Sequence, residues 1–219
     1  EKLPMKVEVK SVADIHKIEL VFATPSCHDY IQTKPESLIT HLIGHEGPGS
    51  ILSKLKQMNL ATELVAWHEN YSFGGFFHFN IDLTNHGYEK IPEVLKIFFS
   101  YVNLLKQNHL PDYITKEKRH MAQVNFDYRE PREGGGFVSQ MASSMHHLPA
   151  LEIEASIALI PEDNQDHLQL FLSHISPKDM TLLVQSKDMA TDQIEPYYQA
   201  SYKTTKISDS LMVELESYS

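Results

Sequence analysis

The chain has little of several features that would place it in a specialised class of protein. It has one cysteine, Cys27, among 219 residues, and this excludes an internal disulfide. Lysine and arginine number 19 against 29 aspartate and glutamate residues, so the formal net charge of −10 argues against a nucleic-acid-binding surface. No apolar run approaches the ~20 residues that a membrane span needs, so we expect a soluble polypeptide with no membrane role.

The length of the chain fits one domain with one substantial core, since 42% of its 219 residues are hydrophobic. We expect a single αβ domain over residues 1–187. Residues 188–219 are polar and weakly periodic, which indicates a tail or a linker towards a next domain. The first residue is Glu1 and not methionine, which suggests a processed chain or a piece of a longer one.

Hydrophobic periodicity predicts a chain that contains both strands and helices. The glycine pair Gly74 and Gly75 predicts a hairpin turn within residues 71–75. The clearest loop covers residues 132–136. The predicted strands cover residues 5–10, 17–24, 61–67, 76–83 and 180–186. The predicted helices cover residues 34–45, 51–58, 84–107, 112–128, 137–147, 151–159 and 163–174.

The segment from His41 to Ser50 carries the most informative pattern in the chain. On the predicted helix, His41 and His45 lie four residues apart, the spacing at which two imidazoles can bind one Zn²⁺, with Glu46 as a third ligand or a base. One hypothesis is therefore an independent hydrolase that uses these three residues. The alternative is structural, because a histidine on a partly apolar helix is often a hydrogen-bonded packing residue.

The same ten residues resemble a signature of the insulinase/pitrilysin family of zinc metallopeptidases, in the second domain of the N-terminal half. Weaker similarities to that domain follow in the same order along nearly the whole chain. They comprise Ile81 to Thr84, the loop with Pro131 and Arg132, the break from His147 to Pro149, and Glu195 to Tyr197 with Tyr202.

In that family zinc is bound by an inverted His-x-x-Glu-His motif in the first domain. None of the 13 histidines here opens this motif, and the nearest candidates, at His16 and His86, lack the second histidine. The resemblance therefore implies a non-catalytic piece of a zinc metalloendopeptidase, with no catalytic or metal-binding residue of its own. Zinc would belong to the first domain of the parent protein, and this fragment alone is expected to be inactive.

The resemblance implies an α+β fold, an αβ sandwich in which a mostly antiparallel sheet packs against several helices, as in the mitochondrial-processing-peptidase-like fold. It also implies how such a domain contributes to substrate binding. Its helix corner and the following strand form an exosite, where the N-terminal end of a peptide adds beside a strand edge by β-augmentation. A carboxylate at the corner is the natural partner of the peptide ammonium group. By resemblance, the exosite residues are His41, Gly44, Glu46, Leu64, Ala66 and His68.

This sequence departs from the family pattern beside the exosite. Insulysin-like members have two glycines and a glutamine where this chain has Ala66, Trp67 and His68, and Thr40 stands where a glycine is expected. A tryptophan would narrow the groove or project to its far face. The alternative function is therefore a catalytically silent structural or assembly domain of a larger complex. The expected partners are a peptide substrate and other domains of the parent chain; the compartment stays open, periplasmic or cytoplasmic if the protein is bacterial.

Overall fold

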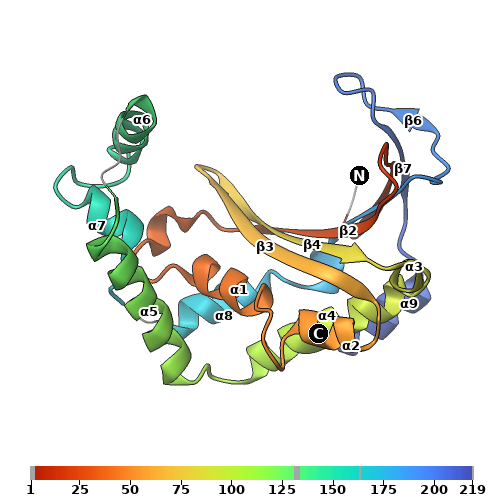
Figure 1. Cartoon of the computed structure of the whole chain (residues 1–219), viewed down its shortest axis with the longest axis horizontal. Coiled ribbons are helices and arrows are strands. Elements are labelled where there is room, and N and C mark those ends of the chain that lie inside the picture. The colour runs from red at the N-terminus through yellow and green to blue at the C-terminus, as the bar shows by residue number, and fades with distance from the viewer. Residues whose placement is uncertain (1–2, 131–133, 163, 219) are drawn as a thin grey trace.

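The computed structural model describes residues 3–130, 134–162 and 164–218. Its centre is a seven-stranded sheet with the strand order β3-β4-β2-β5-β1-β7-β6 (Figure 1). The strands are β1 (Met5–Lys10), β2 (His16–Thr24), β3 (Ala61–Tyr71), β4 (Gly74–Leu83), β5 (Thr181–Ser186), β6 (Gln193–Ile194) and β7 (Ser201–Thr205). The helices are α1 (Pro35–Ile43), α2 (Ile51–Gln57), α3 (Asn85–Glu89), α4 (Ile91–Gln107), α5 (Asp112–Asp127), α6 (Gly135–Ser144), α7 (Ile153–Ala158), α8 (Gln165–Ser173) and α9 (Asp209–Glu216), with 3-10 turns η1 (Cys27–Tyr30) and η2 (Pro177–Asp179).

The sheet is mostly antiparallel and has helices against one of its faces. Among the described strands, β1 and β5 pair in parallel and every other neighbouring pair is antiparallel. In Figure 1 the helices α1, α2, α4 and α8 lie below the sheet, on what we call its helix-covered face. We call the opposite side the open face. This arrangement confirms the predicted α+β class.

The core forms where alternate strand residues meet the helices. Phe98 of α4 is fully buried, with ring centroids 6.3 Å from Phe22 of β2 and 5.1 Å from Phe79 of β4. The period of two puts these strand side chains on the helix-covered face and their neighbours on the open face. The fully buried strand residues of this face are Ile18, Leu20, Phe22, Phe77, Phe79 and Ile81.

The predicted helix over residues 84–107 is wrong as one continuous element. It is two helices, α3 and α4, separated at Lys90, whose φ of −119° and ψ of 28° are not helical. The cause is Pro92, which has no amide hydrogen to donate to the preceding turn and therefore fits only at the start of a new helix. Thr84 caps α3 by accepting a hydrogen bond from the amide of Gly87.

The predicted hairpin between the two central aromatic strands forms, with a shorter turn. Tyr71 pairs with Gly74, so the loop between β3 and β4 consists of two residues, Ser72 and Phe73. Both glycines belong to β4. Gly74 has a φ of +154°, which glycine adopts without strain directly after the turn.

The remaining predicted helices and strands are present, most of them with shifted ends, and Gly135 and Gly136 of the predicted loop belong to α6. Parts of two predictions, the loop with Pro131 and Arg132 and the helix start at Asp163, lie outside the described residues. Within the described part of the chain, no helix combines the length and the apolar character that crossing a membrane requires.

The predicted tail, residues 188–219, contains β6, β7 and α9. β7 pairs antiparallel with β1, and Leu215 of α9 is fully buried in the core. These elements leave no clear signal in the sequence, because the segment is polar and its apolar residues are too widely spaced to show a period. The domain boundary at residue 187 stays a prediction.

Candidate functional site

The corner after α1 lies directly against the edge strand β3. α1 ends at Gly44, whose amide donates to the carbonyl of Thr40 at 2.9 Å. A Cβ atom on Gly44 would lie 2.8 Å from that carbonyl oxygen and 3.3 Å from the Cβ of Ala66 in β3. Glycine therefore lets the helix corner approach the strand closely. The structure thus brings two of the predicted exosite residues together, and Leu64 lies buried two positions before Ala66.

Two side chains of α1, those of Thr40 and His41, lie next to the corner. Thr40, where the family pattern has a glycine, donates its hydroxyl to the carbonyls of Glu36 at 2.9 Å and Ser37 at 3.2 Å. His41 is half-buried, and burial, followed by Lys118 and His45, lowers its pKa below the usual value. The hydroxyl of Thr40 therefore has its hydrogen-bond partners within α1.

His41 and His45 lie beside each other at the helix corner. His45 uses its Nδ1 atom to accept a hydrogen bond from the amide of Gly47 at 2.8 Å, which fixes the ring against the turn. The rings of His41 and His45 are 6.1 Å apart and nearly perpendicular, and the side chain of Glu46 is exposed. Across the described ranges, no group of three or more His, Cys, Asp or Glu side chains can hold a metal ion. The ring of His45 thus contacts the turn that follows the helix.

β3 is an edge strand of the sheet, and it pairs with β4 alone. The two-residue loop makes Tyr71 and Gly74 a hydrogen-bonded pair, so along β3 the amides of alternate residues point away from β4. These outward amides belong to Leu64, Ala66, His68 and Asn70. No hydrogen bond among the described residues engages them. Beside the corner, β3 therefore presents unpaired backbone groups.

The side chain of His68 points away from this edge, onto the helix-covered face. Its Nε2 atom lies 2.8 Å from the hydroxyl of Thr24, and its ring is 3.7 Å from the thiol of Cys27. Gly75 makes room for the ring, because a Cβ there would lie 2.5 Å from His68 Cε1. Burial raises the pKa of the Cys27 thiol, so this cysteine stays protonated. His68 can therefore contribute its amide to the edge, while its side chain is a packing residue.

His68 should make the fold sensitive to acid. Burial, followed by the neighbouring His78, lowers the pKa of His68 from 6.5 to about 4. Between these values the folded state binds fewer protons than the unfolded state, so stability falls as the pH falls through this window. We expect the His68→Asn variant to lose less stability on acidification than the wild type, by about 1 kcal/mol after allowance for solvent screening.

Urea unfolding at neutral pH and at about pH 4.5 measures this difference. The variant His109→Asn, at an exposed position, shows whether removal of any imidazole has the same effect. Equal losses of stability in wild type and His68→Asn would contradict the assignment.

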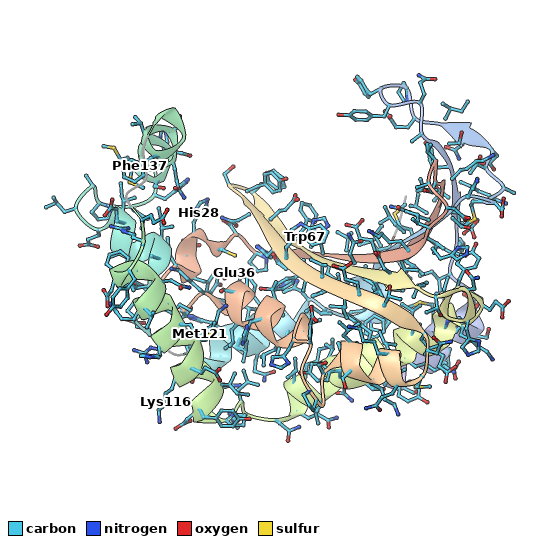
Figure 2. All side chains as sticks on the ribbon, viewed as in Figure 1. His28, Glu36, Trp67, Lys116, Met121 and Phe137 are labelled. Carbon is cyan, nitrogen blue, oxygen red and sulfur yellow. The ribbon has the colours of Figure 1, made fainter. Side chains whose placement is uncertain are left out.

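The open face of β3 carries a second group of side chains, which no motif in the sequence singled out. Trp67 stacks on His78 of β4, with centroids 4.8 Å apart and planes inclined by 6°. The indole Nε1 donates to Glu69 at 3.4 Å, and the hydroxyl of Tyr71 donates to the other oxygen of Glu69 at 2.8 Å. Figure 2 shows Trp67 on the upper side of the sheet, with Glu36 of α1 below it. The period of two along residues 67–71 was the signal that places these side chains on one face.

Comparisons with known proteins agree with this architecture. The profile of the "Peptidase M16 inactive domain" matches residues 1–121, and the profile of the "Middle or third domain of peptidase_M16" matches residues 126–219. The insulin-degrading enzyme of Drosophila melanogaster is 30% identical over 95% of this chain, and the A-factor-processing enzyme of Saccharomyces cerevisiae is 29% identical over 99%. The chain spans 21% of the length of each relative.

The fold itself matches a solved structure. The crystal structure of pitrilysin superposes with a TM-score of 0.89 at 18% sequence identity, covering 98% of this chain and 23% of that one. The profile matches together cover nearly all of this chain, and the first alone covers more than half. The chain therefore belongs to the peptidase M16 family, the family of insulinase and pitrilysin, and corresponds to a non-catalytic part of such a peptidase.

Proposed function

We propose that this chain is the substrate-binding, non-catalytic domain of a zinc-dependent endopeptidase, and that it supplies an exosite for the N-terminal end of a peptide. The observation that carries the proposal is the free edge of β3. Leu64, Ala66 and His68 direct unpaired amides away from β4, and an extended peptide can add there as a further strand. Backbone hydrogen bonds of this kind give affinity with little dependence on peptide sequence.

The helix corner supports the same location. Gly44 packs against Ala66, which puts the turn of residues 44–47 beside the edge. Glu46 in this turn is exposed, and its carboxylate can pair with the ammonium group at the start of a peptide. A peptide lying along β3 would thus meet backbone partners and a negative charge at one place.

The substitution of Trp67 for a glycine is compatible with this proposal. Strand side chains stand roughly perpendicular to the sheet, and the indole of Trp67 lies on the open face, stacked on His78. The backbone edge therefore stays accessible from the side. The substitution changes what the bound peptide's side chains would meet.

The cleavage step belongs to another part of the parent protein in this proposal. The sequence has no His-x-x-Glu-His motif, and the family places zinc in its first domain. Binding at an exosite raises the local concentration of a long peptide near a distant catalytic centre. The role of this chain would thus be to hold substrate, with zinc and proteolysis supplied elsewhere.

A pair of N-methylated peptides tests the exosite. In an added strand, alternate peptide amides point towards β3 and the others point to solvent. Methylation of the amides of one parity is expected to weaken binding to the 219-residue chain by about tenfold or more, because at least two backbone hydrogen bonds are lost. Methylation of the other parity should leave the affinity nearly unchanged. Titrations followed by calorimetry or fluorescence anisotropy measure both.

The peptide of the opposite parity is the matched control, since it carries the same number of methyl groups in the same sequence. Equal weakening by both parities would show that the peptide does not bind as a strand and would contradict the proposal. If no peptide bound at all, the structural or assembly role would become the better explanation of this domain.

A further inference from the structure

Three side chains of β3 form one row on the open face, immediately above the proposed peptide-binding edge. Trp67, Glu69 and Tyr71 are spaced by two residues and therefore project from the same face. Trp67 donates to Glu69 Oε1 at 3.4 Å, and Tyr71 donates to Glu69 Oε2 at 2.8 Å. A carboxylate is thus fixed between an indole and a phenol ring. We call these three residues the Trp67–Tyr71 row.

The carboxylate of Glu69 keeps the capacity to bind a cation. Its side chain is 45% exposed, and each oxygen accepts one of these two hydrogen bonds and retains a further lone pair. Hydrogen bonds from Tyr71 and then Trp67 lower the pKa of Glu69, so it is ionised at neutral pH. Among the ion pairs of the described residues, no lysine or arginine pairs with it, and its nearest basic atom is His78 Nε2 at 3.9 Å.

The surrounding rings are held in place. One face of Trp67 stacks on His78, and Tyr71 stacks on Phe73 with centroids 5.3 Å apart and planes inclined by 10°. His78 is itself fixed by the contact of its Nδ1 with Glu19 at 2.7 Å, while its Nε2 is buried and has no hydrogen-bond partner. Ordered aromatic rings beside a carboxylate attract ammonium and guanidinium groups by cation–π and charge interactions. The net charge of −10 favours the same class of ligand.

We infer that the Trp67–Tyr71 row is a subsite for a lysine or arginine side chain of a peptide bound along β3. The inference rests on the proposed function, because a peptide strand paired with β3 places every second side chain on the open face, opposite this row. The position of the subsite along β3 then sets which peptide residue must be basic. The domain would thereby select among peptides at a point remote from cleavage.

Trp67 is the single tryptophan of the chain, so its fluorescence reports on this place directly. The probes are short tryptophan-free peptides in which one lysine is moved along the sequence, each compared with the same peptide carrying norleucine at that position. For the peptide whose lysine reaches the row, we expect about tenfold tighter binding than for its norleucine partner, and a change in Trp67 fluorescence. The preference should weaken as salt is raised.

The Glu69→Gln variant should lower the ratio of the two affinities severalfold, because the charge interaction is lost while the attraction of the rings remains, and the affinity for the norleucine peptide should change by less than about twofold. Glu63→Gln is the matched control, since it removes an equal charge from an exposed position of the same strand. This control variant should keep the preference.

The outcomes separate the inference from the proposed function. If lysine and norleucine peptides bind the wild type equally at every position, the basic subsite is refuted and the strand-edge exosite stands. If Glu69→Gln keeps the full preference of the wild type, the row is not its source and the inference is again refuted. If neither kind of peptide binds, the exosite itself is wrong, and the subsite falls with it.

Discussion

Replacing Gly87 by alanine is expected to lower the free energy of unfolding by about 3 kcal/mol, because the added methyl group has no room. Gly87 lies in α3, and a Cβ there would be 1.7 Å from the carbonyl oxygen of Leu60 and 2.7 Å from its carbonyl carbon. These are backbone atoms, so they cannot move aside as a flexible side chain does. The same carbonyl accepts a hydrogen bond from the amide of Thr84 at 3.1 Å. The variant must therefore push α3 away from the start of β3 and weaken the helix cap.

Urea unfolding of wild type and Gly87→Ala measures the effect. Gly135→Ala is the matched control, since a Cβ added there, at the start of α6, would meet nothing within 4 Å. That substitution should change the stability by less than about 1 kcal/mol, with stabilisation expected because alanine restricts the unfolded chain. If Gly87→Ala were as stable as the control, the close contact between α3 and Leu60 would be refuted.

Phe98→Ala is expected to cost about 4 kcal/mol, the largest effect predicted for this chain, because it leaves a cavity at the centre of the aromatic core. Phe98 is fully buried, stacks on Phe22 and lies 5.3 Å from Phe99 between ring centroids. These neighbours belong to the sheet and to α4 itself, so few of them can move to fill the space. The measurement is the free energy of unfolding in urea, with circular dichroism to confirm that the variant folds.

Phe73→Ala is the matched control, because it makes the same chemical change at an exposed position. Phe73 is 79% exposed in the turn between β3 and β4, and its truncation should alter the stability by less than about 0.5 kcal/mol. A similar cost for both variants would contradict the placement of Phe98 in the core. A large cost for Phe98→Ala and a small one for Phe73→Ala would show that burial decides how much each phenylalanine contributes to stability.

The sequence was sufficient to predict elements whose apolar residues repeat with a clear period. The alternation in β2 and β4 and the helical spacing in α4 each report a face that is buried, so these elements and the α+β class were predicted correctly. The break at Lys90 was missed because the same apolar spacing continues across it, and only the missing amide of Pro92 separates the two helices. β7 was missed because every one of its residues is only partly buried.

The geometry of the candidate site depends on contacts between segments that are distant in the sequence, and it could not be predicted in the same way. Residues 41–50 predicted a helix corner, but the contact of Gly44 with Ala66 depends on how α1 packs on β3, which no local pattern encodes. The free edge likewise depends on strand order, because β3 would have no unpaired amides if another strand lay beside it. Trp67 and Glu69 could not be selected as binding residues from the sequence. Their inferred role in binding depends on their side chains lying together on the open face, which only the folded structure shows.

The position of β5 has a consequence for the synthesis of the chain. This strand lies between β2 and β1, although it is formed by residues 181–186 and its two neighbours lie within the first 24 residues. During translation, β1 and β2 therefore emerge long before the strand that joins them, and the nascent chain carries unpaired strand edges until β5 arrives. Pairing between segments so distant in sequence is also slow. The incomplete polypeptide on the ribosome is thus the form most exposed to aggregation, and it is the form that molecular chaperones would have to protect.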